Sequence, residues 1–550
     1  MKNFPKQLTL FDDIDTVGLK IEDAACQAGV STATIRNWIK TGYLKLESKG
    51  SVCYKSFDNF LQNVAGTHKL NSRANKSRKD CHDHINVSSE FLRKINTQSN
   101  PIDQISDEYE SSLSDSYRNK EGIYYTPSSV VEDLFKKPFP DVSTKTFCDP
   151  CCGSGNFIMH ALNLGFKPEN IYGYDCDPVA VAITKARIFE KTGYKTKNII
   201  VADFLSSSLK REARLFDCIY TNPPWGKKLP KDERDFYGRI LQAGKSVDTC
   251  SLFFFACLRR LEVSGKLGIL LPEAFFNISS YETVRLKALN LSIERLIDYG
   301  KCFKGLVTKA QAIVLSNKKN KNSSENIVCQ TNNTKFMRTS LSFINNPKSI
   351  FNFHRGKNDS DVIEHIFSLP HVTLKNNADW GLGIVTGNNT KFCRNTPSAG
   401  YMPVYKGSDI TKTGLKESHC FIPRDLTQYQ QVAPVEMFEA EEKLIYKFIS
   451  SDLYFFCDTQ KRYVLNSINM LIPKKSFPVK NKQLCLLLNC DFINWLFKSI
   501  FNTHKILRGD LESLPIHAEY FERHAVFNEN TYLSFLNLEK TNNGTYRIKR

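Results

Sequence analysis

Short apolar runs alternate with helix-like patterns between about residues 117 and 222, and each run ends at or just before an acidic or amide residue. Four of these runs have the length of buried strands, and an apolar helix pattern at 158–164 follows the first of them. The four runs lie at 146–149, 171–175, 198–202 and 216–219. Such alternation predicts an α/β fold with a parallel sheet.

Two helix patterns lie near the start of the chain, in residues 16–46. A tight turn at Gly29 separates them, Ser31 is placed to cap the second helix, and Gly42 is placed to end it. Two helices joined by a short glycine-containing turn predict a helix-turn-helix, whose second helix can enter a DNA major groove. A small helical packing module or protein contact is the alternative interpretation.

The string at 28–44 resembles the helix-turn-helix of the MerR and excisionase type. We therefore predict a helix-turn-helix module over residues 1–65. Its candidate groove-contacting residues are Thr32, Thr34, Arg36 and Asn37. The sequence then turns polar, and we predict a polar linker or a partly ordered helical connector over residues 66–115, since such a composition cannot bury a core.

A second mixed pattern begins near residue 370, beyond a polar loop at 317–326. Short strand patterns with Gly and Asn turns precede a helical run at 484–501, which together predict an α+β domain. The strand patterns lie at 380–389, 402–410 and 462–473. Basic side chains can position on phosphates, and Arg can read bases. The candidates here are Lys391, Arg394, Lys406, Lys461 and Arg462, each of which is alternatively an ordinary solvated charge.

The 550 residues are enough for two to four domains, and a formal net charge of +18 favours a nucleic-acid partner over a small acidic substrate. The 17 cysteines are scattered singly apart from Cys148, Cys151 and Cys152, which lack the spacing of a zinc site. We therefore expect no metal, and reduced thiols. Because the chain has no apolar run of about 18–20 residues, we expect a soluble cytoplasmic protein with no membrane partner.

Residues with useful chemistry gather where the predicted strands end. Gly153 and Gly155 follow the strand that ends at Asp149, and glycines let a backbone approach a ligand closely ahead of a helix N-terminus. Asp149 would repel a phosphate there and suits a cation such as an ammonium group. Asp175 ends the next strand, where ribose-binding acids stand in nucleotide folds, and Asp203 follows the third. The carboxyl ends of successive parallel strands predict one ligand site.

The fourth strand ends in Asn222-Pro223-Pro224-Trp225. Because neither proline has an amide hydrogen and both have a fixed φ, the backbone there is rigid. The Asn222 side-chain oxygen and the Pro223 carbonyl can accept the two hydrogens of one exocyclic amine, which frees the nitrogen lone pair for attack. Trp225 can stack on the ring that carries this amine. A proline-rich turn without chemistry is the alternative.

These stretches resemble a known family. The motif at 149–157, with Asn-Pro-Pro-Trp at 222–225, is similar to that of the gamma class of adenine-N6 DNA methyltransferases in type II restriction-modification systems. The string Tyr-Tyr-Thr-Pro at 124–127 resembles the first motif of that class and precedes the glycine-rich loop as it does there. The resemblance covers about residues 117–317.

The resemblance implies a Rossmann-like S-adenosylmethionine-dependent methyltransferase domain over residues 116–345 and an α+β target-recognition domain over residues 346–550. The implied cofactor contacts are Tyr125, Thr126, Pro127, Asp149, Gly153 and Gly155, with Asp175 on the ribose and Asp203 and Phe204 on the adenine. The implied catalytic residues are Asn222, Pro223, Pro224 and Trp225, with Phe303 stacking on the other face of the target base. Two residues depart from the family pattern: Cys151 replaces a more usual alanine, and Asp175 replaces a common glutamate.

The implied reaction moves a methyl group from S-adenosylmethionine to the N6 amine of a flipped adenine, at a specific sequence in double-stranded DNA. The expected partners are that DNA and a separate cognate restriction endonuclease. We expect a monomer because one chain carries both the catalytic and the reading domain. Two alternatives stay open: methylation of RNA or of a protein glutamine amide, and a DNA-binding regulator whose methyltransferase domain has degenerated.

Overall fold

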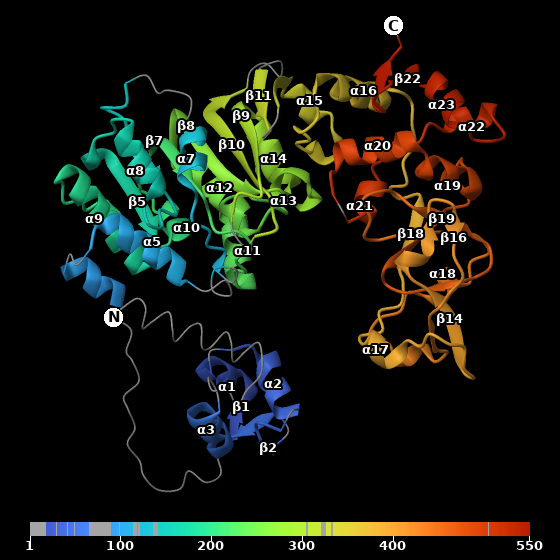
Figure 1. Cartoon of the computed structure of the whole chain (residues 1–550), viewed down its shortest axis with the longest axis horizontal. Coiled ribbons are helices and arrows are strands. Elements are labelled where there is room, and N and C mark those ends of the chain that lie inside the picture. Colours follow the sequence, from blue (N-terminus) through green and yellow to red (C-terminus); the bar gives the residue numbers. More distant parts are fainter. Residues whose placement is uncertain are drawn as a thin grey trace. The chain divides into compact units, whose positions relative to one another are not determined.

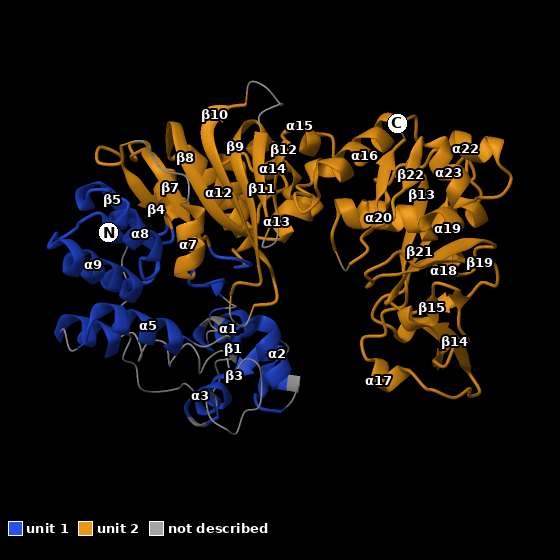
Figure 2. Cartoon of the chain, turned by 45° about the horizontal axis from the view of Figure 1, so that its top comes forward, with its two compact units in different colours: residues 1–126, 151–203, 224–227 blue, residues 127–150, 204–223, 228–550 orange. Residues whose placement is uncertain are grey.

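A computed structural model describes most of the chain as two compact units, coloured separately in Figure 2. The described residues are 18–28, 30–40, 42–48, 50–64, 90–97, 100–113, 118, 121–135, 141–303, 306–320, 326–331, 334–503 and 505–549. Unit 1 comprises Met1–Thr126, Cys151–Asp203 and Pro224–Lys227, and unit 2 comprises Pro127–Pro150, Phe204–Pro223 and Lys228–Arg550. The chain passes between the units inside the motifs at 124–127, 149–157 and 222–225 and between Asp203 and Phe204, so each unit carries part of these motifs.

Residues 18–64 of unit 1 form a small module with its own hydrophobic core. Its elements are β1 (Gly18–Lys20), α1 (Ile21–Ala28), α2 (Thr32–Lys40), β2 (Leu46–Ser48), β3 (Ser51–Cys53) and α3 (Tyr54–Asn63), and the strands pair antiparallel in the order β1-β3-β2. Both predicted helices are present. The Ser31 hydroxyl accepts the Thr34 amide hydrogen at 3.2 Å, and Gly42, at φ 81°, follows α2. Gly29 lies outside the described residues.

The remainder of unit 1 is a parallel strand pair with helices. β5 (Ile171–Asp175) runs parallel to β6 (Ile199–Val201), as predicted. The accompanying helices are α5 (Ile102–Ser112), α8 (Asn156–Asn163), η1 (Pro168–Asn170) and α9 (Pro178–Thr192). The Asp177 side chain caps α9 by accepting the Val179 amide hydrogen at 2.9 Å.

From residue 90 onward, the segment predicted as a polar linker or partly ordered helical connector contains helices. Residues 90–97 are helical, and with α5 they share a buried core with α9. The buried residues are Phe91, Ile102, Ile105, Tyr109, Leu113, Val179 and Ile183. In α5 the apolar residues recur at i, i+3 and i+7, which is the spacing of one helix face. The residues between them are polar, so the segment as a whole has a polar composition. The earlier part of the predicted linker, residues 66–89, lies outside the described residues.

Seven strands of unit 2 lie side by side in the order β12-β11-β9-β10-β8-β7-β4. β4 (Phe147–Asp149), β7 (Phe216–Thr221) and β8 (Leu261–Pro272) run parallel, and β10 (Ala310–Lys319) is antiparallel to both β8 and β9 (Leu291–Gly300). β11 (Asn326–Gln330) runs parallel to β9, and β12 (Lys335–Thr339) is antiparallel to β11. With β5 and β6 of unit 1, all four predicted strands are confirmed.

Helices cover this sheet. They are α7 (Ser128–Leu134), α10 (Phe204–Ser208), α11 (Lys231–Ile240), α12 (Thr249–Arg259), α13 (Ala274–Asn277), η2 (Ser279–Tyr281) and α14 (Glu282–Leu289). α12 packs on β8, and α14 packs on β9 (Figure 1). Because α12 is buried on nearly every side, it has no polar face and reads in the sequence as a continuous apolar run.

The C-terminal part of unit 2 begins with α15 (Leu341–Ile344), η3 (Pro347–Ser349) and α16 (Lys357–Ser368). An antiparallel sheet follows in the order β13 (Ala378–Leu382), β21 (Ile468–Pro473), β18 (Lys443–Lys447) and β19 (Phe455–Asp458). A second sheet has the order β17 (Phe421–Pro423), β14 (Tyr401–Tyr405) and β20 (Tyr463–Val464). This region has two hydrophobic cores and is α+β, as predicted.

Shorter elements complete the C-terminal part. Before β20 these are α17 (Asn389–Phe392), η4 (Gly407–Asp409), β15 (Ile410–Thr411), β16 (Gly414–Leu415), η5 (Leu426–Gln428) and α18 (Val435–Phe438). After β21 come α19 (Asn481–Asn489), α20 (Asp491–Ile500), α21 (Arg508–Leu511), α22 (Ala518–Arg523), α23 (Glu529–Phe535), β22 (Leu538–Lys540) and β23 (Tyr546–Ile548). In the part of the chain that the structure describes, no helix is long and apolar enough to cross a membrane.

The helical run predicted at 484–501 is two helices, α19 and α20. Cys490 separates them in an extended conformation (φ −69°, ψ 155°), and its thiol accepts the Ile493 amide hydrogen at the start of α20. Both helices bury apolar faces, so the hydrophobic pattern continues across the break. A cysteine that caps a helix is not among the residues that usually signal a helix start, which is why the sequence did not show the break.

Candidate active site

Asp149 and Asn222 stand at the ends of neighbouring parallel strands in unit 2. β4 pairs with β7 in register, so both strands bring their last residues to the same edge of the sheet. Asp149 is fully buried, and Asn222, one residue beyond β7, is half-buried. Burial, and then the charge of Asp149, hold the pKa of the adjacent Cys148 thiol well above its ordinary value, so this thiol is neutral.

Close packing fixes the end of β7. The Tyr220 ring, two residues before Asn222, stacks on Phe135 with centroids 4.1 Å apart. A Cβ at Gly268, on the neighbouring strand β8, would lie 2.2 Å from the Tyr220 ring, so only glycine leaves room for it. At the other end of β7, the Asp217 carboxylate accepts the Thr146 amide hydrogen at 3.0 Å. The position of Asn222 therefore depends on packing along the whole strand.

Trp225 belongs to unit 1 and is held against the segment that precedes the first motif. Its amide hydrogen is donated to the Gly122 carbonyl at 3.0 Å, and its ring lies 6.1 Å from the Tyr124 ring. A Cβ at Gly122 would lie 2.4 Å from the Trp225 carbonyl oxygen, so this approach also needs glycine. The Trp225 side chain is only 6 % exposed.

Phe303 belongs to unit 2 and follows β9. It is also 6 % exposed, and its carbonyl accepts the Leu306 amide hydrogen at 3.4 Å. Each of the two rings predicted to stack on a base is therefore covered in this structure.

The glycine-rich loop of unit 1 has the backbone that its glycines imply. Gly153 and Gly155 have φ values of 49° and 95°, in the left-handed region that favours glycine. The Thr184 hydroxyl of α9 donates to the Gly153 carbonyl at 2.8 Å, and a Cβ at Gly155 would lie 2.8 Å from that hydroxyl oxygen. The Tyr125 ring sits 3.1 Å from where a Cβ of Gly153 would be. Gly155 is thus required by close approach as well as by φ, whereas Gly153 is required by its φ and has a tight contact with Tyr125.

Asp175 orders this loop. Its two carboxylate oxygens accept the Gly153 amide hydrogen at 2.8 Å and the Asp177 amide hydrogen at 2.9 Å. Burial raises the pKa of Asp175 to about 6, because these hydrogen bonds only partly offset the loss of water around the charge. Each oxygen keeps a further lone pair, so the carboxylate can hold the loop and still accept a ligand hydroxyl.

The structure also gives the surroundings of the first motif and of the residues that follow the third predicted strand. The Thr126 carbonyl, buried, accepts the Asn156 side-chain amide at 3.1 Å, which ties the motif to the start of α8. Pro127 is the residue immediately before α7. Asp203 follows β6 and is half-buried, whereas Phe204, the first residue of α10, is buried in unit 2 and stacks on Phe253 at 6.3 Å.

Sequence reasoning missed a network of charged residues behind the loop. Asp177 accepts the Tyr109 hydroxyl, and Glu110 accepts the Ser154 hydroxyl. Burial raises the pKa of Glu110. Arg187 of α9 completes the network, because it donates to the Ser154 carbonyl at 2.9 Å. The Asp-Pro pair at 177–178 is a helix-start signal that could have indicated Asp177, but Tyr109 and Glu110 lie in the segment assigned to a linker.

Two family models match the chain. The model described as N-6 DNA Methylase matches residues 100–364, and the one described as TaqI-like C-terminal specificity domain matches residues 402–516. The first match contains the strand ends and the glycine-rich loop, and the second contains β14 to β21.

Two relatives agree with these matches, and one of them is matched over its whole length. The chain is 50% identical over 409 residues to the type II methyltransferase M.VspI of Vibrio sp. (strain 343), a match that spans 74% of this chain and 100% of that protein. The chain belongs to the type II N6-adenine DNA methyltransferases. It is also 27% identical over 193 residues to the modification methylase CviBIII of Paramecium bursaria Chlorella virus NC1A, across 34% of this chain and 48% of that protein.

A solved structure shows the same fold. The type IIL restriction-modification enzyme MmeI in complex with DNA aligns with a TM-score of 0.51 at 11% identity, over 74% of this chain and 70% of that one. This methyltransferase thus has the predicted α/β fold with a C-terminal specificity domain. The predicted activity, sequence-specific transfer of a methyl group from S-adenosylmethionine to N6 of adenine in DNA, is confirmed by the family.

The donor set fits S-adenosylmethionine. In unit 2, the fully buried carboxylate of Asp149 suits an ammonium group. In unit 1, the carboxylate of Asp175 accepts two amide hydrogens and has lone pairs that suit ribose hydroxyls. The glycine-rich loop, where a Cβ would obstruct its neighbours, allows close approach of a ligand to the backbone. Nothing in this set repels the cofactor's positive charge.

The five basic residues predicted to contact DNA differ in their surroundings. Lys391, Arg394 and Lys461 are exposed, and the Arg394 guanidinium lies 4.4 Å from the centre of the Tyr401 ring. Lys406 is half-buried beside η4. Arg462 is bound to the buried Asp458 at 2.7 Å, so it is not the free surface charge that the sequence suggested.

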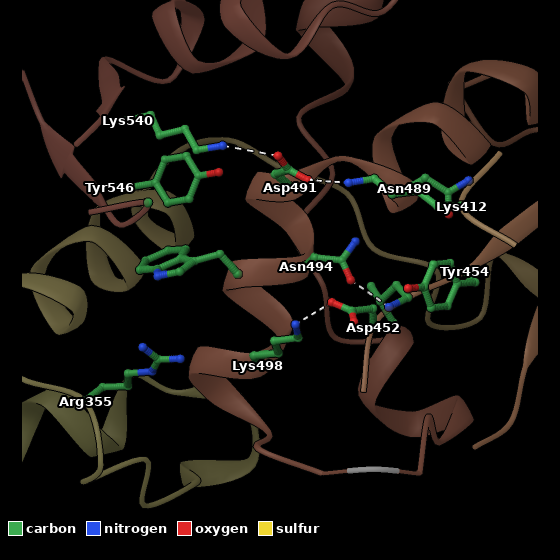
Figure 3. Close-up of a pocket in the computed structure, with 13 residues that line it drawn as sticks. Arg355, Lys412, Asp452, Tyr454, Asn489, Asp491, Asn494, Lys498, Lys540 and Tyr546 are labelled. Atoms are coloured by element: carbon green, nitrogen blue, oxygen red, sulfur yellow. Dashed lines mark hydrogen bonds and ion pairs between the residues drawn. The ribbon is translucent and has the colours of Figure 1, made fainter. Parts of the chain in front are cut away.

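A cavity of about 430 Å³ in the C-terminal part is lined by four cationic side chains, Arg355, Lys412, Lys498 and Lys540 (Figure 3). Lys412 and Lys540 both pair with Asp491 at 3.2 Å, and Lys498 pairs with Asp452. The hydrogen bonds from Lys540 and Lys412 lower the pKa of Asp491. These pairs join β22 and the β15–β16 turn to α20, so we assign the cavity a structural role.

Proposed function

We propose that Asn222 and Pro223 hold the N6 amine of the target adenine. The observation that carries this proposal is the placement of Asn222 and Asp149 at the ends of adjacent parallel strands of unit 2. The Asn222 side-chain oxygen and the Pro223 carbonyl accept the two amine hydrogens. This pulls the nitrogen toward tetrahedral geometry and frees its lone pair. Pro223 and Pro224 have no amide hydrogens, so the backbone there cannot compete for these acceptors.

The cofactor side of the proposal follows the strand ends. S-adenosylmethionine, when bound, supplies an activated methyl group. The residues proposed to bind it are Tyr125, Thr126, Pro127, Asp149, Gly153, Gly155, Asp175, Asp203 and Phe204. Asn222 is neutral and therefore positions the amine without acting as a strong base. The surplus amine proton passes to water, and positioning supplies much of the rate.

Trp225 and Phe303 are proposed to stack on the flipped base. Extruding an adenine from a duplex costs a few kcal/mol, and stacking contributes about 1–3 kcal/mol per base, so two rings offset this cost. Since each ring is 6 % exposed here, base entry requires both to move out of their present packing.

Single-molecule sequencing of DNA from a methylation-free host that expresses the chain tests the proposal. We expect N6-methyladenine in one short motif with the wild type, and none with Asn222→Ala, whose S-adenosylmethionine affinity should stay within a few-fold of the wild type. Asn163→Ala, at an exposed asparagine on α8, is the matched control and should methylate normally.

Two outcomes would count against this assignment. Turnover of Asn222→Ala within a few-fold of the wild type would remove Asn222 from the catalytic role. Unmodified DNA from a wild type that binds the cofactor would point to RNA or a protein amide as the acceptor, because Asn-Pro-Pro-aromatic sites can also hold such amines.

We further propose that the enzyme is a cytoplasmic, monomeric member of the gamma class that protects host DNA from a separate restriction endonuclease. The order of the motifs supports the class, since the first motif at 124–127 precedes the glycine-rich loop. The presence of a methyltransferase region and a specificity region in one chain supports action as a monomer.

The N-terminal module is proposed to bind DNA as a helix-turn-helix and to control the enzyme's own operon. Arg36 and Asn37 are exposed on α2, and Thr32 and Thr34 are half-buried on it. Arg36→Ala in the full chain should abolish a gel shift with DNA from upstream of the operon while leaving methylation unchanged. An unaltered gel shift would remove α2 from this role.

A further inference from the structure

The loop between β19 and β20 is anchored by hydrogen bonds to a buried carboxylate. It runs from Asp458, which is fully buried, to Arg462, and residues 459–461 between them are exposed. It lies inside the match to the specificity domain. Base-reading residues must be both accessible and fixed in geometry, and the exposed residues of this loop meet the first condition.

Asp458 is the anchor. It pairs with Lys443 of β18 at 2.6 Å, and both side chains are completely buried. It also accepts the amide hydrogens of Gln460 at 3.2 Å and Arg462 at 2.9 Å, so the carboxylate closes the loop on itself. Burial raises the pKa of Asp458, but the hydrogen bonds from Lys443 and Arg462 outweigh it and hold that pKa below the ordinary value. The Asp458 carboxylate is therefore ionised near neutral pH.

Arg462 connects the buried Asp458 to the exposed part of the loop. Its guanidinium donates to Asp458 at 2.7 Å, to the Tyr405 hydroxyl at 3.3 Å and to the Gln460 side-chain oxygen at 2.6 Å. A guanidinium is planar, so three such bonds fix its orientation, and the third fixes the amide of Gln460. The exposed Gln460 side chain is thereby bonded to a guanidinium that Asp458 and Tyr405 orient.

The tip of the loop has a strained backbone. Lys461 has φ 54°, in the left-handed region that residues other than glycine seldom adopt. Such strain persists where the surroundings determine the conformation, and it concentrates at functional sites. At this position it turns the chain so that Gln460 and Lys461 are both exposed.

We propose that Gln460 reads an adenine of the recognition sequence in the major groove and that Arg462 and Asp458 are its positioning residues. A glutamine amide can donate to N7 of adenine and accept from its N6 amine at the same time. The bond from Arg462 occupies one lone pair of the Gln460 oxygen and leaves the other, together with both amide hydrogens, for the base. Lys461 then lies beside it to contact a phosphate. This inference rests on the DNA methylation described above.

The test compares full-length variants on DNA. For Gln460→Ala we expect the wild-type motif to relax at one position, with the kcat/KM ratio of cognate to singly substituted sites falling by about 10- to 100-fold, which is the range of one bidentate base contact. Gln428→Ala, at another exposed glutamine of the same domain, is the matched control and should keep the motif. Cofactor affinity should be unchanged in both.

Arg462→Lys tests the positioning role, since it keeps the charge but cannot bond Asp458, Tyr405 and Gln460 together. We expect it to relax the same motif position as Gln460→Ala, a result that a purely structural role would not give. Relaxation at a different position, or an unchanged site ratio for Gln460→Ala while the wild type methylates a defined motif, would overturn the proposal. A wild type that methylates no DNA would instead refute the function itself.

Discussion

We expect the carboxylate of Asp175, a proposed cofactor contact, to make cofactor binding depend on pH. Its pKa is raised to about 6 by burial, and in the ionised form it accepts the amide hydrogens of Gly153 and Asp177. Protonation replaces one acceptor oxygen by a donor, so one of these bonds is lost and the glycine-rich loop loosens. We therefore expect the Kd for S-adenosylmethionine, measured by calorimetry, to rise as pH falls through about 6.

Asp175→Asn isolates this effect. The amide keeps one acceptor at every pH, so we expect weaker but nearly pH-independent cofactor binding between about pH 5 and 7, a window centred on the raised pKa. If the variant shows the same pH dependence as the wild type, another group is responsible.

Gly268 illustrates how a residue without a side chain determines catalytic geometry. A methyl group at this position would lie 2.2 Å from the Tyr220 ring, two residues before Asn222. Gly268→Ala should lower the free energy of unfolding by about 1–3 kcal/mol, as overpacking does, and should also reduce methylation in the remaining folded protein because the end of β7 shifts. Denaturant titration and a methylation assay on the same preparation measure both effects.

The matched control for that variant is Gly356→Ala. Gly356 has a negative φ and nothing within 4 Å of an added Cβ, so stability and activity should both stay close to the wild type. Equal losses in the two variants would show that crowding at Tyr220 is not the cause.

At the scale of elements, His517 links α16 to α23. Its ring nitrogens lie 2.7 Å from the Tyr532 hydroxyl and 3.2 Å from the Ile366 carbonyl oxygen, which together suit the neutral ring. Burial lowers the pKa of His517 to about 4. The unfolded chain, with an ordinary histidine pKa of about 6.5, therefore binds a proton more readily than the folded one, and stability falls as pH drops from about 6.5 to about 4.

The expected loss of stability from His517 is on the order of 3 kcal/mol across that window, because the pKa falls from about 6.5 in the unfolded chain to about 4 in the folded protein. Thermal unfolding of the wild type and His517→Gln between pH 4 and 7 measures it. The variant should be less stable at pH 7 but should lose less stability toward pH 4. Parallel curves for the two proteins would assign the pH dependence to another group, such as His354, whose pKa burial also lowers, to about 3.

The sequence predicted elements well where one physical rule dominated. The strands before Asp149, Asp175, Asp203 and Asn222 were all found, because buried parallel strands read as apolar runs and end in polar residues at the ligand edge. It missed features that tertiary contacts decide. The break at Cys490 depends on a thiol cap, and the ion pair of Arg462 depends on a carboxylate four residues away whose burial no local pattern reveals.

At the scale of the whole molecule, the distribution of charge distinguishes the two regions proposed to contact DNA, which are the N-terminal module and the remainder of the enzyme. Residues 1–64 contain eight Lys or Arg and seven Asp or Glu, a net charge of +1 out of +18 for the chain. Nearly all of the excess positive charge therefore lies beyond the N-terminal module. Since the salt dependence of DNA binding reflects the number of phosphates that Lys and Arg neutralise, bulk affinity should come from the remainder of the enzyme.

An Arg36→Ala, Asn37→Ala double variant tests this division. On DNA that lacks the operon's upstream sequence, its plot of log K against log salt should have a slope within about 1 of the wild-type slope, because a single phosphate contact changes the slope by roughly that amount. Fluorescence anisotropy between 50 and 200 mM salt gives both slopes, a range over which about 6–10 phosphate contacts would reduce affinity by about 10³- to 10⁵-fold. A slope reduced by several units would mean that α2 lies on the DNA during methylation, and the module would then belong to target binding and not to control of the operon.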